Sequence, residues 1–338
     1  PTGAKNLQQD NLLDEGVKPD LVWIKNRDAT DNHQWYDSTR GPLLEMHTNT
    51  TDQESTTTDG LQKFLKGGCA IEDDVSINTV SESYVAWNWV ANGGTTSANT
   101  DGSGATLAST IQANQDAGFS IVQVTAPSSP SGTYKIAHGL GAAPQWIIAK
   151  NTENSGGYHW TVYHHKTASD AHTDYLILNN TNAYADDATL WGDTAPTSSV
   201  FTAGVGAPLL ANEKTMFYCW TGIEGYSKFN LYLGNANADG PFIYTGFKPA
   251  WLMLRPLAGG SWIIIDRTRS QLNPVNRTLW ANLTTAESTS YSWCDFLANG
   301  FKLRDASNGL NNSGAVYMYM AFAEHPFVGN GTNPVTAR

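Results

Sequence analysis

One short phrase occurs three times in this chain of 338 residues, and it limits the folds that the chain can adopt. Each copy has a proline, a variable residue, an apolar run and a cation at the seventh place: PDLVWIK at 19–25, PQWIIAK at 144–150 and PAWLMLR at 249–255. An apolar run of about five β-branched and aromatic residues is typical of a buried central strand. We expect the closing cation (Lys25, Lys150 or Arg255) to reach the surface at the strand end.

The spacing around the three phrases indicates a repeated unit. An alternating aromatic segment closes each copy, and these segments end at Trp89, Trp220 and Phe322. The distance from the proline to this closing aromatic residue is nearly the same in all copies, although the residues between them diverge. Such internal similarity indicates three copies of one architecture.

Short apolar or alternating runs separated by turn residues fill each copy, and no convincing amphipathic helix interrupts them. This pattern is typical of all-β folds, so we expect three tandem antiparallel β-sandwich or jelly-roll-like domains. A propeller is disfavoured because a blade takes only about 40 to 50 residues. The expected parts are an N-terminal arm (1–18), a short first β repeat (19–91), a polar linker (92–117), a second β repeat (118–225) and a third β repeat (226–338).

The first copy lacks a leading strand. Apolar segments that begin at Phe119 and Phe229 precede the second and third prolines, whereas no equivalent segment precedes Pro19. The sheet edge of the first copy must therefore be supplied by the N-terminal arm, by another chain or by residues outside the given sequence.

Composition excludes several classes of partner. The net charge is −11 and no cluster of Lys or Arg occurs, which disfavours binding to nucleic acid or to an anionic membrane. The chain also has no run of 18 apolar residues and no secretion signal, so membrane insertion is not expected. The three cysteines (Cys69, Cys219 and Cys294) are expected to be buried apolar residues rather than disulfide partners.

Candidate catalytic and metal-binding groups are weak. Asp37 and Asp266 occupy equivalent places, but the second copy has His164 there, so strand-end carboxylates are favoured over a retained acid or base. His164 and His165 are adjacent and would face opposite sides of a strand, which disfavours a shared metal ion. The acidic run at 72–74 could hold Ca²⁺ through its oxygens, although a solvated turn is favoured. No cofactor and no metal are expected.

Aromatic residues offer the best candidate binding groups. Trp23, Trp87, Trp146, Trp220 and Trp251 lie within alternating strands and are expected in the core. Four aromatic residues in segments expected to be exposed loops are candidates for stacking on a sugar: Tyr158, Tyr184, Trp191 and Tyr291.

Several phrases, taken in order, resemble a repeat domain of tailed bacteriophages, found especially in tail-fibre-like and other virion proteins of marine and cyanobacterial phages. The phrases are residues 19–27, 84–89, 138–144, 225–229 and 323–327, and the resemblance covers roughly residues 19 to 338. It implies a virion structural or host-adhesion role without enzymatic activity. It carries over no catalytic or binding motif.

The leading hypothesis is a phage virion protein, a fibre, decoration or receptor-binding module that acts by surface contacts, including contacts with glycans. Its expected location is the virion, assembled in the host cytoplasm. The expected partners are other virion proteins, further copies of the chain in a homo-oligomer (a trimer is favoured) and a host-surface glycan or protein. One alternative is a purely structural assembly protein, and a second is a glycan-degrading tailspike, which would need two carboxylates at glycosidase separation.

Overall fold

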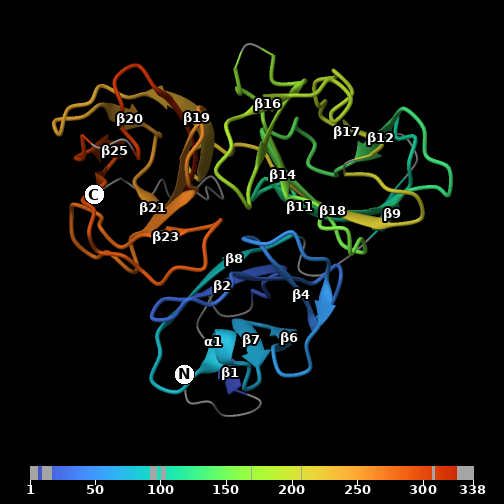
Figure 1. Ribbon diagram of the computed structural model, residues 1–338, viewed down its shortest axis with the longest axis horizontal. Helices are drawn as coiled ribbons and strands as arrows, with labels where there is room; N and C mark the ends of the chain where they lie inside the picture. Colours follow the sequence, from blue (N-terminus) through green and yellow to red (C-terminus); the bar gives the residue numbers. More distant parts are fainter. Residues whose placement is uncertain are drawn as a thin grey trace, which may run out of the picture.

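The computed structural model describes residues 7–9, 17–91, 97–99, 104–168, 170–206, 208–306 and 309–325. Within these ranges the fold is all-β, with antiparallel sheets and one four-residue helix, α1 (Val75–Asn78). Figure 1 shows three lobes arranged in a ring, which we call unit 1 (up to residue 91), unit 2 (97–225) and unit 3 (226–325). None of the described helices is long and apolar enough to cross a membrane.

Unit 1 has a five-stranded main sheet in the order β5-β4-β3-β2-β8 and a smaller sheet in the order β1-β7-β6. Helix α1 lies between β7 and β8 in the chain. The strands are β1 (Leu7–Gln9), β2 (Leu21–Asn26), β3 (Gln34–Asp37), β4 (Leu44–His47), β5 (Ser55–Thr56), β6 (Leu61–Leu65), β7 (Gly68–Ile71) and β8 (Tyr84–Trp89).

Unit 2 has an eight-stranded main sheet in the order β16-β15-β14-β13-β18-β11-β10-β9 and a two-stranded sheet, β12-β17. The strands are β9 (Ser97–Asn99), β10 (Ser109–Asn114), β11 (Phe119–Thr125), β12 (Thr133–Ala137), β13 (Trp146–Asn151), β14 (Thr161–His164), β15 (Asp174–Ile177), β16 (Ala185–Asp186), β17 (Val200–Gly204) and β18 (Lys214–Trp220).

Unit 3 has a five-stranded main sheet in the order β19-β26-β21-β22-β23 and a smaller sheet in the order β20-β25-β24. The strands are β19 (Ser227–Leu233), β20 (Phe242–Tyr244), β21 (Pro249–Pro256), β22 (Ile263–Asp266), β23 (Leu279–Trp280), β24 (Cys294–Leu297), β25 (Gly300–Leu303) and β26 (Val316–Ala323).

The three main sheets have the same strand order around the repeated phrase. The strand that carries the phrase (β2, β13 or β21) pairs antiparallel with the next strand on one side and with the closing strand (β8, β18 or β26) on the other. In units 2 and 3 a leading strand, β11 or β19, pairs with the closing strand. In unit 1, β8 ends the sheet.

Two segments differ from the expectations. The expected linker at 92–117 contains β10, which pairs over its whole length with β11, so this part of the segment belongs to the main sheet of unit 2. The N-terminal arm contributes β1, but β1 pairs with β7 of the smaller sheet. Among the described residues, the arm therefore does not complete the main sheet of unit 1 beside β8.

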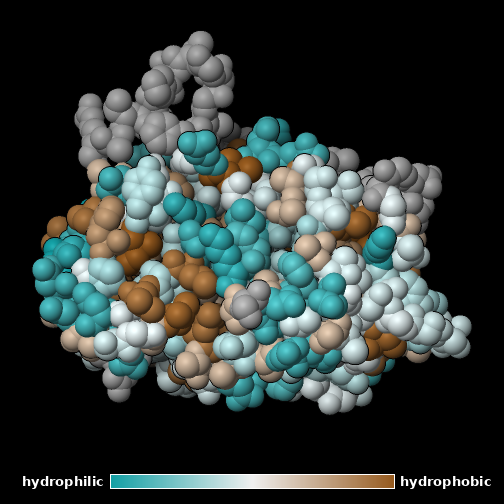
Figure 2. Space-filling model, turned by 90° about the horizontal axis from the view of Figure 1, so that it is seen from above, coloured by the Kyte–Doolittle hydropathy of each residue, from teal (hydrophilic) through white to brown (hydrophobic). Residues whose placement is uncertain are grey.

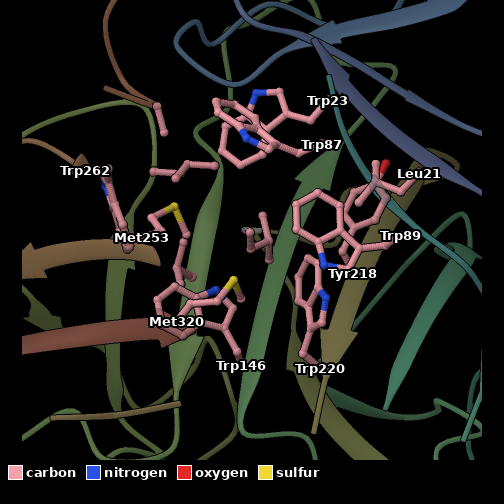
Figure 3. Close-up of a cluster of buried hydrophobic side chains, with 14 of the residues drawn as sticks. Leu21, Trp23, Trp87, Trp89, Trp146, Tyr218, Trp220, Met253, Trp262 and Met320 are labelled. Carbon is pink, nitrogen blue, oxygen red and sulfur yellow. The ribbon is translucent and has the colours of Figure 1, made fainter. Parts of the chain in front are cut away.

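Both faces of each main sheet are buried, and alternate residues divide between two cores. In β13, Trp146 and Ile148 enter one core, whereas Ile147 and Ala149 enter another. The first core is shared by all three units and lies where the main sheets face one another (Figure 3). The second is local to the unit and lies between its main and smaller sheets. Burial on both faces explains why the phrase is continuously apolar.

The tryptophans assigned to the core from the sequence are buried, and this expectation is confirmed. Trp23, Trp87, Trp146, Trp220 and Trp251 are all less than a tenth exposed and all belong to the shared core. Trp89 belongs to the same core, and its ring meets two of these rings across unit boundaries. It lies 5.7 Å from the ring of Trp251 and 6.1 Å from that of Trp220. The three cysteines are also free and buried, as expected.

The expectation that the three cations reach the surface is wrong, because Lys25, Lys150 and Arg255 are all fully buried. They follow the shared-core side of their strands and meet backbone carbonyls instead of water. Lys150 Nζ donates to Thr51 O of unit 1 at 2.9 Å and to Tyr158 O at 2.6 Å. Arg255 donates to two carbonyls of unit 2. Carbonyls of unit 1 and unit 2 thus serve the cations of units 2 and 3, whereas Lys25 donates to Asn26 O and Ala29 O of its own unit.

A second set of hydrogen bonds closes the ring of units. Trp160 Nε1 of unit 2 donates to His47 O of unit 1 at 2.9 Å, and Trp262 Nε1 of unit 3 donates to Ile177 O of unit 2 at 2.8 Å. His33 has the corresponding place in unit 1, and its Nε2 lies 3.0 Å from Trp280 O of unit 3.

The His33 ring is neutral in this arrangement. Trp23 Nε1 donates to His33 Nδ1 at 3.0 Å, so this nitrogen carries no hydrogen, and Nε2 donates to the carbonyl. Burial lowers the pKa of His33 well below its usual value. The side chain therefore links two units without a buried charge.

Trp146→Ala should destabilise the whole chain rather than one unit. The Trp146 ring contacts His164 in its own unit and Phe229 and Trp262 in unit 3, so its loss leaves a cavity at a unit boundary. We expect the free energy of unfolding to fall by about 4 kcal/mol. Denaturant unfolding followed by tryptophan fluorescence and by far-ultraviolet circular dichroism should give one coincident transition. Separate transitions by the two probes would contradict a shared core.

The two buried lysines predict a specific pH dependence. Burial lowers the pKa of Lys25 and of Lys150 to about 8, while Asp31 and Asp52, respectively, act in the opposite direction. Between pH 8 and about 10.4 the unfolded chain holds protons that the folded chain has released, so these lysines make stability rise with pH.

Lys150→Met should remove part of this rise. The unfolding free energy of the wild type minus that of the variant should increase from pH 8 to pH 10, because tyrosine and cysteine contributions cancel in the difference. Urea unfolding at a series of pH values measures it. A difference that is flat or decreases with pH would show that Lys150 keeps its usual pKa in the folded chain.

Candidate functional site

The four aromatic candidates occupy different environments. The expected exposure of Trp191 is wrong: the side chain is 2% exposed and lies in the local core of unit 2, with its ring 5.6 Å from that of Tyr163. The turn that carries it folds back onto β17, where Gly204 N donates to Leu190 O at 2.8 Å. The polar residues and the glycine that follow Trp191 suggested an exposed loop, but the turn is buried at Trp191.

Tyr158 and Tyr184 lie in loops of unit 2 near different neighbours. Tyr158 is half-buried, and its carbonyl holds the Lys150 ammonium group. Tyr184 is 40% exposed, and its backbone N–H donates to Leu257 O of unit 3 at 3.0 Å. These contacts place Tyr158 near unit 1 and Tyr184 near unit 3, so the structure does not bring the two together.

Tyr291 lies in an open pocket of unit 3 with a volume of about 530 Å³, which we call the Tyr291 pocket. Its ring stacks on Trp293 at 4.5 Å, with 13° between the planes, and meets the edge of Trp280 at 6.2 Å. Trp293 is buried and fixed, because its Nε1 donates to Thr278 Oγ1 at 2.7 Å. The lining residues are Pro256, Gly259, Gly260, Ser261, Ile263, Trp280, Tyr291, Trp293 and Gly309.

Glycine keeps the Tyr291 pocket open. A Cβ atom on Gly309 would lie 2.7 Å from Cη2 of Trp293, so any larger residue would push into the aromatic wall. Gly259 has a φ of +102°, which L side chains rarely adopt, and a Cβ there would meet Thr181 O of unit 2. The loop that carries Gly259 therefore lies close against unit 2, on the side where Tyr184 binds Leu257.

The chemistry of the Tyr291 pocket suits recognition of a neutral, partly apolar ligand. Its lining contains a tyrosine hydroxyl, a serine hydroxyl and backbone groups, but no Asp, Glu, His, Lys or Arg. Aromatic faces with a few polar groups at the rim are typical of sites that stack on sugars.

A larger cleft of about 690 Å³ lies between units 2 and 3, and we call it the Lys166 cleft. Lys166 Nζ donates to Asn230 Oδ1 at 3.0 Å, and Lys228 lies 5.0 Å from the centre of the exposed Tyr244 ring. Burial and the charge of Lys166 lower the pKa of Lys228. Glu224 is the one carboxylate among its lining residues.

The outer surface differs between the two units that border this cleft. Figure 2 shows hydrophobic residues gathered on the unit 3 side of the face it displays, whereas the unit 2 side is largely polar. Exposed apolar side chains of unit 3 include Leu233, Phe242 and Val316.

The acidic candidates have structural roles. Asp37 and Asp266 are buried and form equivalent ion pairs with Arg40 and Arg269, each at 2.5 Å. Each also receives a hydrogen bond from another unit: Asp37 from Tyr218 Oη at 2.7 Å, and Asp266 from Trp87 Nε1 at 3.1 Å. Asp37 and Asp266 thus lie at the ends of β3 and β22, as expected, and each also bonds across a unit boundary.

The His164 and His165 rings, the first metal candidates, lie 5.1 Å apart, but the two side chains have different partners. His164 packs its ring edge-on against Trp146, whereas His165 Nε2 donates to Phe229 O at 3.0 Å. In the acidic run at 72–74, Asp74 caps helix α1 by accepting from Ser76 N. Within the part of the chain that the structure describes, no group of three His, Cys, Asp or Glu side chains is placed to hold a metal ion.

A family model matches residues 2–326, which include parts of all three units, and its description is a domain of unknown function, DUF7483. The chain belongs to the DUF7483 family. No curated protein and no solved structure matches it. A single family model across all three units agrees with their shared core.

Sequence reasoning missed most of the Tyr291 pocket in this DUF7483 chain. It singled out Tyr291 but not Trp280, Trp293 or Gly309, which the fold brings together from β23, the residue just before β24 and the loop before β26. One signal was available: Tyr291 and Trp293 are two residues apart, a spacing that puts side chains on one face of an extended segment.

Proposed function

We propose that this DUF7483 chain is a structural protein of a tailed-phage virion, a fibre, decoration or receptor-binding module, and that it binds a glycan without cleaving it. The phage assignment rests on the resemblance of the repeated phrases described above. The glycan assignment rests on the Tyr291 pocket, an open aromatic site without charged groups. Host-surface glycan is the corresponding ligand, and the virion is the corresponding location.

The Tyr291 pocket is the observation that carries the binding proposal. Tyr291 is 36% exposed while its stacking partner Trp293 is fixed by a hydrogen bond, so the ring offers a face in a defined orientation. A preorganised aromatic face stacks on the C–H groups of a pyranose at little entropic cost. Binding residues in general are found disproportionately on loops that a rigid scaffold positions.

The chemistry of both cavities favours binding over hydrolysis. Glycoside hydrolysis needs two carboxylates that flank the scissile bond. The Tyr291 pocket has none among its lining residues, and the Lys166 cleft has Glu224 alone. Asp37 and Asp266 are engaged in buried ion pairs at unit boundaries.

Tyr291→Ala should weaken glycan binding about five- to thirty-fold. A glycan array with the wild-type chain should show saturable binding of neutral oligosaccharides, and titration calorimetry should show a loss of about 1 to 2 kcal/mol in the variant, the range of one aromatic stacking contact with desolvation. Gly309→Ala should have the same effect, because the added methyl group meets the Trp293 ring.

Tyr244→Ala is the matched control, since Tyr244 is an exposed tyrosine of unit 3 that lines the Lys166 cleft instead. Its variant should bind like the wild type, and thermal unfolding should verify that all three variants are folded. Loss of binding in Tyr244→Ala alone would move the site to the cleft. No binding by any folded protein on the array would contradict the glycan proposal, and release of reducing ends from a bound polysaccharide would favour the tailspike alternative.

A further inference from the structure

The outer edge of β8 presents backbone groups that bond to no neighbouring strand among the described residues, although Asn88 Nδ2 donates to Ala86 O at 3.3 Å. Arg27 N donates to Ser83 O at 2.8 Å, and in an antiparallel ladder the residues that bond to the partner strand alternate. The odd-numbered residues of β8 therefore bond to β2, and the backbone groups of Tyr84, Ala86 and Asn88 point away from it. Among the described residues, no backbone group pairs with them.

The same edge is occupied in the other two units. Strand β11 pairs with β18 along seven residues, and β19 pairs with β26 along seven. The strands β18 and β26 are buried apart from their ends, whereas four of the six residues of β8 are partly exposed.

The two leading strands share one chemistry. Each begins its core-facing stretch with phenylalanine, continues with a polar residue and then has an aliphatic residue: Phe119-Ser120-Ile121 and Phe229-Asn230-Leu231. Phe119, Ile121 and Phe229 enter the shared core, and Leu231 packs against it. An occupant of the β8 edge would meet the same core from unit 1.

Strand β8 lacks the features that usually protect an edge. Natural sheets discourage pairing at their edges with charged residues, proline or bulges. The sequence of β8 is Tyr-Val-Ala-Trp-Asn-Trp, without a charge or a proline. Two exposed valines, Val75 (69%) and Val80 (60%), lie just before it, and Tyr84 Oη holds Val75 O at 3.0 Å. Exposed apolar side chains thus occur in the segment that leads into the strand.

In unit 3, the Arg267 side chain bonds to no other unit among the described residues. His165 of unit 2 donates to Phe229 O on the leading strand of unit 3. The equivalent residue of unit 3 is Arg267, because it likewise follows the residue paired with the tryptophan of the phrase. Its contacts are with Ser270 O and Glu324 in its own unit.

We propose that the outer edge of β8 binds an extended segment of another polypeptide, uncharged in its centre and with the pattern phenylalanine, polar, aliphatic, by adding it as a leading strand to unit 1. Backbone hydrogen bonds to Tyr84, Ala86 and Asn88 supply affinity, and the two apolar side chains supply specificity. The site is separate from the Tyr291 pocket, so it stands without the glycan proposal. It gives the chain an assembly contact.

A peptide with the sequence of β11 tests this proposal. The probe is GFSIVQVT, residues 118–125, with a fluorescein and a short solubilising tail, titrated with the full chain. We expect saturable fluorescence anisotropy, and hydrogen exchange should slow at the amides of Tyr84, Ala86 and Asn88 when the peptide is present. A peptide of the same composition in scrambled order is the control and should not bind.

Ala86→Pro is the decisive variant. Proline removes an N–H that points outward, so it leaves the bonds to β2 in place and should not change the thermal stability. It should weaken binding of the β11 peptide about tenfold or more. Ala86→Ser keeps the N–H and should bind like the wild type.

Three results would overturn the proposal. The first is equal binding of the β11 and scrambled peptides, and the second is unchanged binding in a folded Ala86→Pro variant. The third combines two observations: slow hydrogen exchange at the amides of Tyr84, Ala86 and Asn88 without peptide, and self-association of the chain that Ala86→Pro abolishes. Together they would show that a second copy of the chain occupies the edge.

Discussion

The structure depends on one constraint: each main sheet buries both of its faces. Alternate residues of the repeated phrase enter two different cores. One core is local to the unit, and the other is common to all three units. A single unit would expose Trp146 and Ile148, or their counterparts, to water, at a cost of about 1.5 to 3 kcal/mol for each large side chain. The three units therefore fold as one body, although their sequence repeats suggest separable domains.

Polar groups at the ends of the shared core fix how the units meet. An apolar core alone would tolerate sliding of one sheet against another, whereas Lys150 and Arg255 must find carbonyls on the neighbouring unit to offset their desolvation. His33 has the same task at the third boundary as a neutral donor. The burial of each polar group costs desolvation free energy, and its acceptor on the neighbouring unit favours one arrangement of the units.

The sequence predicted the strands and the aromatic core because period and residue type are local signals. It could not predict the burial of Lys150 and Arg255, since carbonyls of another unit accept their hydrogen bonds. Trp191 was expected in an exposed loop for a similar reason: its turn is polar in sequence but folds back on β17. The Tyr291 pocket was only partly foreseen, because the fold brings Trp280 of β23 and Gly309 of the loop before β26 to its wall.

Departures from the repeated pattern locate the candidate functions. At the place where Trp280 builds the pocket of unit 3, units 1 and 2 have His47 and Ile177, whose carbonyls serve the ring of hydrogen bonds in the same way. The backbone role is kept in all three units, so the tryptophan side chain is free to serve another purpose. Unit 1 departs in the opposite sense: among its described residues, no strand lies beside β8 as β11 and β19 lie beside β18 and β26. One unit of the ring can change without the other two, because the shared core and the hydrogen bonds between units hold the ring closed.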